Sequence, residues 1–339
     1  MRLPTTMARW SYQSCDMNSV EHCELTEIAA RLGSETYHFV GSASFEARAF
    51  GIWDHLRSTI KGRKVICYNA NHGAYLAEGL RRFAESDASL EIVKLDSDSP
   101  MATFTALRAM VDSLASGGPC RLVLDVTGFT REVVAMLIYL GQHRLVRGST
   151  VKIVYQKAGG YGQTPVGGWL SQGVREVRTV LGYAGLVRLS AETHLILLGG
   201  FEFERAQEVV DALQPRRISL GRVAAENSVS VDLNDQLSSF LAKLEALYAG
   251  PAFDRIEFSS VDPFVTRDSI LQHRRTSDDN IVIACMNTKL SMVGVCLAAL
   301  TDQTLQLIYA QPLIYNVATY SKPSGKALLC TLAIEPGGR

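Results

Sequence analysis

The chain has 339 residues, a hydrophobic fraction of 47%, and 34 basic side chains against 34 acidic ones. This length suits two domains of ordinary size, and the hydrophobic content excludes an intrinsically disordered protein. The balanced charge excludes a broad basic surface for nucleic acid, and no apolar run approaches the roughly 18 to 20 residues of a membrane span, so we expect no membrane partner.

The N-terminal residues 1–34 carry little pattern, and we expect a partly disordered extension in which either Met1 or Met17 is the start. A basic segment followed by an apolar one, the mark of a signal peptide, is missing, which predicts a cytoplasmic protein. The seven cysteines are scattered, without the short Cys or His spacings of metal ligands. We therefore expect reduced thiols, no metal and no cofactor.

Residues 35–157 alternate short apolar strands with amphipathic helices, joined by short connections. Such alternation predicts a doubly wound, mainly parallel sheet, which is a Rossmann-like domain. The central strand is expected at Arg121–Asp125, where RLVLD is apolar enough to be covered on both faces, and a helix follows from Arg131. The other expected strands are 37–41, 65–69, 90–95 and 151–155, and the other expected helices are 45–61, 72–85 and 101–114.

The composition changes after this domain. Residues 158–190 begin with a glycine-rich stretch, AGGYGQTPVGGW, and 170–181 has apolar residues at helical spacing, so we expect a glycine-rich loop and a linker helix. Residues 191–325 predict a second Rossmann-like domain, and residues 326–339 a C-terminal strand and tail. In the second domain we expect strands at 194–199, 217–221, 254–259, 280–286 and 305–309, and helices at 234–248 and 262–274. Two more segments, 199–213 and 287–300, stand where the loop-and-helix segments of the first domain stood.

Two segments recur in the same order in both domains. The stretch SASFEARAFGIWDHL of the first domain parallels GGFEFERAQEVVDAL of the second, and the strand RLVLD parallels NIVIACM. A single shared segment would be coincidence, but two at similar separation within the same strand and helix series indicate an internal duplication. The predicted fold class is therefore α/β, with two tandem Rossmann-like domains related by duplication.

In each domain, two of the predicted loops fall at the carboxyl edge of the sheet, where open α/β sheets bind ligands. They combine small residues, hydroxyl or amide groups and cations beside a helix start, a composition that suits a phosphate. The capping of helices, Glu–Arg pairing and close backbone packing explain the same residue types without a ligand. The candidate ligand-binding residues are Ser42, Ser44, Glu46, Arg48, Asp125, Thr127, Gly128, Thr130, Arg131, Gly199, Gly200, Glu202, Arg205, Asn287, Thr288 and Lys289.

The segment DVTGFTR, residues 125–131, resembles the D-x-T-G-G-T-K turn of the CRISPR-associated Rossmann-fold (CARF) sensor domains. Asp125, Thr127, Gly128 and Thr130 match that turn, while Arg131 replaces its lysine and a phenylalanine replaces its second glycine. In the second domain only the NTK segment, residues 287–289, is similar to it. The resemblance implies a sensor that binds a cyclic oligonucleotide in prokaryotic antiviral defence and acts with an effector.

We therefore predict a sensor or regulatory protein of antiviral defence that binds a phosphorylated nucleotide or oligonucleotide. Its partner would be a separate effector protein, and a homodimer is left open. One alternative is an enzyme, a metal-independent phosphodiesterase of the ring-nuclease type, whose catalytic residues stay unassigned. The other is a ligand-free scaffold subunit of a defence complex.

Overall fold

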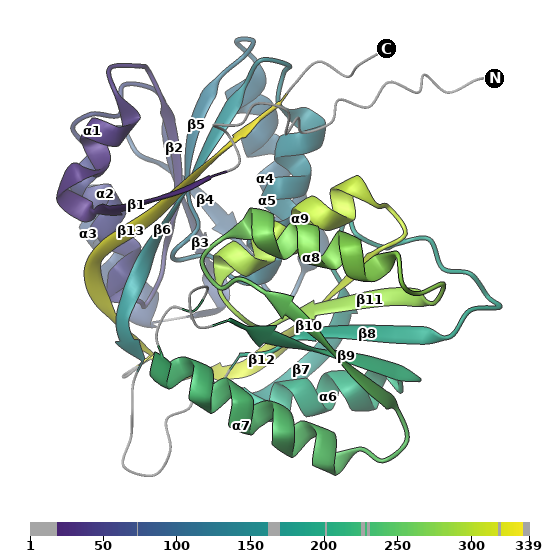
Figure 1. Cartoon of the computed structure of the whole chain (residues 1–339). Helices are drawn as coiled ribbons and strands as arrows, with labels where there is room; N and C mark the ends of the chain where they lie inside the picture. The colour runs from purple at the N-terminus through teal and green to yellow at the C-terminus, as the bar shows by residue number, and fades with distance from the viewer. Residues whose placement is uncertain are drawn as a thin grey trace, which may run out of the picture. The chain divides into compact units, whose positions relative to one another are not determined.

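The structure is a computed structural model that describes residues 19–72, 74–161, 170–200, 202–224, 228, 231–317 and 320–334. Strands and helices alternate along the chain, as predicted (Figure 1). The two candidate starts and the extension up to residue 18 lie outside the described residues, as do residues 162–169 of the glycine-rich stretch. Residues 158–161, expected to begin the glycine-rich loop, instead end a strand. No helix within these described ranges is long and apolar enough to cross a membrane.

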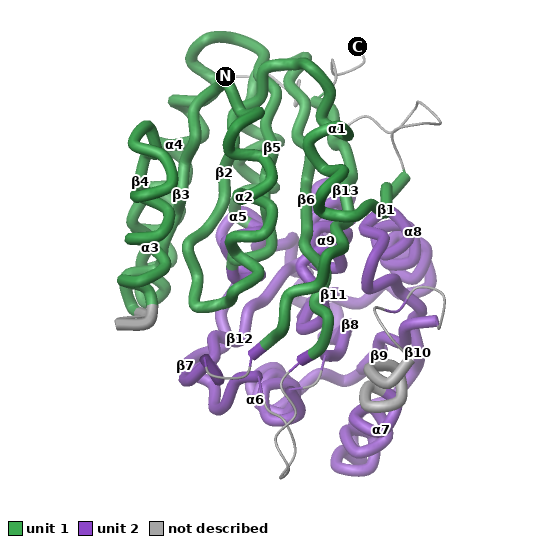
Figure 2. Tube along the Cα trace, turned by 90° about the vertical axis from the view of Figure 1, so that its left-hand side faces the viewer, with its two compact units in different colours: residues 1–129, 136–160, 321–339 green, residues 130–135, 161–320 purple. Residues whose placement is uncertain are grey.

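The chain divides into two compact units, each built from separated segments (Figure 2). Unit 1 comprises residues 1–129, 136–160 and 321–339, and unit 2 comprises residues 130–135 and 161–320. The domain limits predicted from the sequence, with boundaries after 34, 157, 190 and 325, stay predictions.

The sheet of unit 1 has the strand order β1-β13-β6-β5-β2-β3-β4. Strands β2 to β6 are parallel to one another, whereas β1 pairs with β13 in the antiparallel sense. The parallel strands follow the order of a Rossmann fold, whose order reverses between β2 and β5. The strands are β1 Val20–Glu24, β2 His38–Ala43, β3 Lys64–Asn69, β4 Glu91–Leu95, β5 Arg121–Asp125, β6 Thr150–Tyr161 and β13 Ser321–Ala333.

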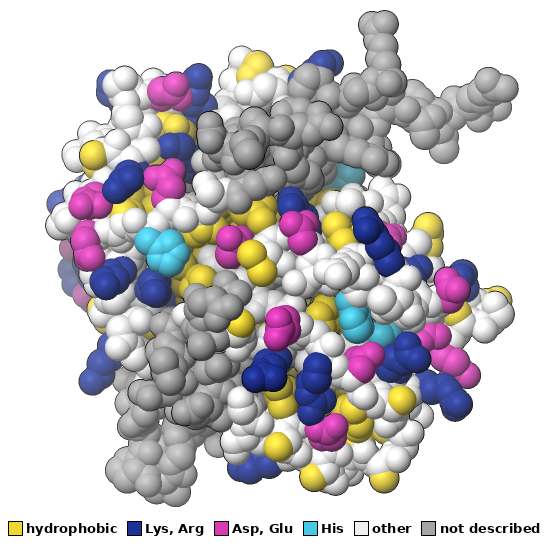
Figure 3. All heavy atoms as spheres, in the orientation of Figure 1, with side chains coloured by type: hydrophobic (Ala, Val, Ile, Leu, Met, Phe, Trp, Pro, Cys, Tyr) yellow, Lys and Arg dark blue, Asp and Glu magenta, His cyan; other side chains and the backbone are white. Residues whose placement is uncertain are grey.

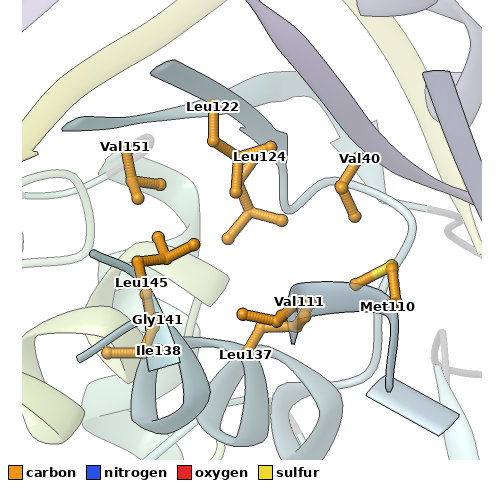
Figure 4. A pocket seen from close by; sticks show the side chains of 10 residues that line it. All are labelled: Val40, Met110, Val111, Leu122, Leu124, Leu137, Ile138, Gly141, Leu145 and Val151. Carbon is orange, nitrogen blue, oxygen red and sulfur yellow. The ribbon is translucent and has the colours of Figure 1, made fainter. Parts of the chain in front are cut away.

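Helices cover both faces of this sheet. On one face Phe39, Trp53 and Phe83 form an aromatic cluster with α2 and α3. On the other face α4 and α5 enclose an apolar cavity of about 20 Å³, which Leu124 and Val111 help to line (Figure 4). The helical segments are η1 Leu25–Glu27, α1 Ile28–Leu32, η2 Ala47–Phe50, α2 Gly51–Leu56, η3 Ala70–His72, α3 Ala74–Ser86, α4 Pro100–Ala115 and α5 Arg131–Arg144.

Unit 2 contains a sheet of strand order β10-β9-β8-β11-β12-β7. Strands β8 to β12 are parallel, and β7 pairs antiparallel with β12. Helices α6 and α7 lie on one side of the sheet, and α8 and α9 on the other (Figure 1). The elements are β7 Ser171–Thr179, β8 Thr193–Leu198, α6 Phe203–Leu213, β9 Arg217–Val223, α7 Val231–Leu247, β10 Ala252–Phe258, α8 Pro263–Arg274, β11 Asn280–Cys285, α9 Lys289–Thr301 and β12 Gln306–Tyr315.

The two units repeat one architecture, down to a hydrogen bond. Strands β2 to β6 take the same order in unit 1 as β8 to β12 take in unit 2. In unit 1 the hydroxyl of Thr103 accepts from the Asp96 amide and donates to its carbonyl. In unit 2 the hydroxyl of Thr266 does the same with Ser259. These matched contacts support the internal duplication and align α4 with α8.

The predicted linker helix at 170–181 is wrong, because these residues form strand β7. Val174, Val177 and Val180 recur every three residues, which favours a helix when the segment is read alone. Strand β12 would otherwise leave its outer backbone groups unpaired, and β7 satisfies them. The pairing also exchanges strands between the repeats: β7 follows β6 in the chain but joins the sheet of unit 2, whereas β13 follows β12 but joins that of unit 1.

Candidate functional site

In unit 1 the predicted loops lie at the carboxyl ends of β2 and β5, where they pack on each other. The Oδ1 atom of Asp125 accepts from the Thr127 amide at 2.9 Å, and the Thr127 hydroxyl accepts from the Gln156 amide at 2.9 Å. A Cβ atom on Gly128 would lie 2.7 Å from the carbonyl oxygen of Ser42. This glycine is therefore required where the two loops meet, as the close-packing interpretation expects.

Glu46 and Arg48 form a buried ion pair in the same unit. Arg48 is 1% exposed, and its Nη2 atom lies 2.5 Å from Oε2 of Glu46. The guanidinium also donates to the hydroxyl of Tyr155 and to the carbonyl of Gln156, and the hydroxyl of Ser321 donates to Glu46. This cation is thus engaged by the chain itself.

Unit 2 repeats this ion pair with Glu202 and Arg205. Arg205 donates to Glu202 and to the carbonyl of Ala310, and Ser171 donates to the same carboxylate. The guanidinium lies 5.8 Å from the ring centroid of Tyr309, as Arg48 lies 5.6 Å from that of Tyr155. In both repeats, therefore, the Glu–Arg pair joins a helical segment to the last parallel strand: η2 to β6 in unit 1, and α6 to β12 in unit 2.

The other predicted residues of unit 2 surround the start of α9. Thr130 and Arg131 belong to unit 2 and not to unit 1, although residues 125–128 of the same loop belong to unit 1. Arg131 donates to the carbonyls of Met286 and Asn287. Burial disfavours its charge, but the net effect of Tyr320, Glu202 and nearby groups raises the pKa of Arg131, so it stays protonated.

Capping and close contact account for most of the remaining predicted residues. The hydroxyls of Thr130 and Thr288 accept from amides of the first helical turns, as capping residues do. In unit 2, a Cβ atom on Gly200 would lie 2.3 Å from the Met286 carbonyl, and the Asn287 side chain donates to the Gly199 carbonyl. Lys289 is buried in the same unit. In unit 1, the Ser44 hydroxyl accepts from the Glu46 amide. The structure therefore gathers the predicted residues in two sets, one in each unit, and their ligand-binding role stays a prediction.

A different cluster lies at the amino end of the unit 2 sheet. His194 at the start of β8, Asp254 on β10 and His273 in the last turn of α8 each offer one ligand atom, and these atoms lie within 4.8 Å of one another. In Figure 3, histidine atoms reach the surface beside acidic and basic side chains in the part of the view that the strands of unit 2 occupy in Figure 1. Three separate elements thus bring two imidazoles and a carboxylate together.

Ser219 on β9 links the two imidazoles. Its Oγ atom lies 2.6 Å from Nε2 of His194 and 2.7 Å from Nε2 of His273, so both nitrogens converge on one hydroxyl. Among the described residues, Nδ1 of the fully buried His194 and Oδ1 of Asp254 have no hydrogen-bond partner. Burial lowers the pKa of His194 to about 4 and also lowers that of His273, so both rings are neutral at pH 7 and keep a lone pair.

Strand register identifies the equivalent position in unit 1. Phe39 pairs with Lys64 as Leu195 pairs with Ile218, and Val65 pairs with Glu91 as Ser219 pairs with Asp254. With α4 aligned on α8, His38, Val65, Glu91 and Met110 occupy the places of His194, Ser219, Asp254 and His273.

The chemistry of this position differs between the units. In unit 1, Arg63 holds Glu91 through two hydrogen bonds of 2.6 and 2.5 Å, and Nδ1 of His38 accepts from the Arg63 amide. In unit 2, Arg217 occupies the place of Arg63, but among the described residues it forms an ion pair with Asp279, at 3.8 Å, and not with Asp254.

The sequence prediction of no metal site missed this cluster. Its members are far apart in the chain, so no short ligand spacing marks them. One signal was present: once the repeats are aligned, Ser219 and His273 replace an apolar valine and methionine on a face that packs against a helix.

No known protein family and no curated protein matches this chain. Among solved structures, it is similar to the S-adenosylmethionine-dependent methyltransferase SibL, with 8% identity, coverage of 40% of this chain and 36% of that chain, and a TM-score of 0.24. The predicted O-methyltransferase Atu636 of Agrobacterium tumefaciens has 11% identity, coverage of 40% and 62%, and a TM-score of 0.25. A geranyl diphosphate methyltransferase has 8% identity, coverage of 91% of this chain and 77% of that chain, and a TM-score of 0.26. The chain spans less than two thirds of the first two proteins.

These findings correct the prediction of an antiviral nucleotide sensor. The matched proteins named above are methyltransferases, and the arginines Arg48 and Arg205, which that prediction assigned to a ligand, lie in buried ion pairs. The ring-nuclease and scaffold alternatives assumed the same defence role and are corrected with it. At TM-scores near 0.25, the likeness carries no activity over to this chain, and the CARF-like resemblance stays a prediction.

Proposed function

We propose that unit 2 binds a divalent transition-metal ion of the zinc class through His194, Asp254 and His273. The observation that carries this proposal is the approach of the three ligand atoms to within 4.8 Å of one another. Two imidazole nitrogens and a carboxylate oxygen form a donor set that zinc accepts, and three protein ligands leave room for a fourth.

The local geometry supports the proposal in two ways. Ligand atoms around a tetrahedral zinc ion lie roughly 3.3 Å apart, so these atoms, which lie within 4.8 Å of one another, need to approach by about 1.5 Å at most. Ser219 Oγ holds both Nε2 atoms at hydrogen-bond distance, so its hydroxyl has to rotate away for an ion to bind through them. Among the residues that the structure describes, Oδ1 of Asp254 has no hydrogen-bond partner, whereas Arg63 holds both carboxylate oxygens of Glu91 in unit 1.

Metal titration tests the proposal directly. The metal-free protein is titrated with Zn²⁺ by calorimetry and with Co²⁺ by visible absorption, and one ion per chain is expected. Asp254→Asn and His273→Gln remove a ligand each and should lower the affinity at least tenfold, whereas His38→Gln changes the equivalent histidine of unit 1 and should leave it unchanged.

Thermal unfolding gives an independent measurement. A metal that binds the folded state at a hundred times its Kd stabilises it by about 2.7 kcal/mol. The melting temperature should therefore rise with Zn²⁺ for the unchanged protein and for His38→Gln, but not for Asp254→Asn. Absence of binding, or equal binding by all variants, would overturn the proposal.

A further inference from the structure

Arg217 is the charged side chain that stands beside the His194–Asp254–His273 cluster. It is the register partner of His194 on the neighbouring strand and lies two residues from Ser219, so it projects on the same face of the sheet as both. Its side chain is 41% exposed, whereas His194 is fully buried. Arg217 therefore places a positive charge at the solvent side of the cluster.

The equivalent arginine of unit 1 shows what Arg217 lacks. Arg63 binds both carboxylate oxygens of Glu91 and also donates to the hydroxyl of Ser113. Among the described residues, Arg217 makes only the ion pair with Asp279, whose 3.8 Å separation is longer than a hydrogen bond. The guanidinium nitrogens of Arg217 can therefore donate hydrogen bonds to a further partner.

The cluster also borders the surface. His273 and Asp254 are half-buried, so part of each of these two side chains is exposed to solvent. The residue that faces Arg217 on β10 is Ala252, whose side chain is small and exposed. A zinc-class ion held by three protein ligands keeps at least one position for water or for an added ligand.

We propose that the metal ion and Arg217 together bind a small oxyanion, an inference that rests on the proposed metal site. One oxygen of the anion takes the open position of the metal, and others accept hydrogen bonds from the guanidinium, whose fork matches carboxylate and phosphate groups. Phosphate and carboxylate share this chemistry, and the experiment distinguishes them.

The test uses the full chain loaded with Co²⁺, whose visible spectrum reports changes in its ligands. Inorganic phosphate and acetate are titrated separately, and at least one should change the spectrum in a saturable way. Arg217→Met should keep the Co²⁺ affinity but weaken the anion at least tenfold, because the metal ligands remain while the guanidinium is lost. Arg222→Met removes an exposed arginine from the other end of β9 and should change neither affinity.

The outcomes separate this inference from the proposed function. Failure of Co²⁺ to bind the unchanged protein overturns both. Co²⁺ binding without a spectral change from either anion, or with an equal change in Arg217→Met, overturns the oxyanion site and leaves the metal site standing. A response to phosphate alone assigns a phosphate-type ligand, and a response to acetate alone assigns a carboxylate.

Discussion

The buried ion pair of unit 1 gives the sharpest prediction for stability. Glu46→Gln keeps the size of the side chain but removes the charge beside Arg48, which is 1% exposed and holds Oε2 of Glu46 at 2.5 Å. Removing one partner of a buried pair leaves an uncompensated charge, which costs about 3 to 5 kcal/mol. Tyr155 and Gln156 still accept from the guanidinium, so we expect a loss near the lower end, about 3 kcal/mol.

Urea unfolding followed by circular dichroism measures this loss, and a double variant tests its cause. Glu46→Gln combined with Arg48→Met removes both charges and should recover a large part of the lost free energy of unfolding, because an apolar side chain replaces the buried cation. Glu78→Gln breaks an exposed pair with Arg81 and should leave the midpoint unchanged. A single-variant loss under about 1 kcal/mol, or a double variant less stable than the single, would refute the reasoning.

Three further predictions concern single positions. Burial lowers the pKa of His194 to about 4, against 6.5 for a free side chain, so the unfolded chain binds a proton at this position more readily than the folded chain. The free energy of unfolding of the metal-free protein should therefore fall by up to about 3 kcal/mol between pH 6.5 and pH 4. A urea midpoint that does not change over this pH range would contradict this prediction. Gly128→Ala places a Cβ atom 2.7 Å from a carbonyl oxygen and should cost about 1 to 3 kcal/mol in urea unfolding, whereas Gly117→Ala, with no atom within 4 Å, should cost nothing measurable. Val111→Ile adds a methylene at the cavity of unit 1 and should raise stability by up to about 1 kcal/mol in thermal unfolding; an equal gain from Val187→Ile, at a 63% exposed position, would remove the cavity as the cause.

Much of the fold could be predicted because local patterns and tertiary contacts agree along most of the chain. The apolar run Arg121–Asp125 is a strand that helices cover on both faces, and the helix begins at Arg131 as expected. The segment 171–179 departs from prediction because its helical spacing is overridden by the need to pair the outer edge of β12. Pairing with a distant strand leaves no trace in a short window of sequence.

The candidate site was predictable only in part, for a related reason. The Glu–Arg pairs of both repeats are visible in the sequence, but the burial that separates an ion pair from a ligand site is not. The cluster of His194, Asp254 and His273 depends on the register of three strands and on where α8 ends. Aligning the repeats before searching for ligands would have drawn attention to it.

The exchange of β7 and β13 between the repeats makes the two halves of the chain mutually dependent. A cut at the fully exposed Leu189 would leave an N-terminal piece that carries β7 without its partner β12, and a C-terminal piece that carries β13 without its partner β6. Each piece would present a bare sheet edge, so neither should persist alone in solution, yet the mixture should reconstitute the whole. An ancestral protein with a single repeat can also cover the edge of its sheet if two copies form a dimer that exchanges its last strands. Fusion of the two genes then joins this strand-swapped dimer into one polypeptide.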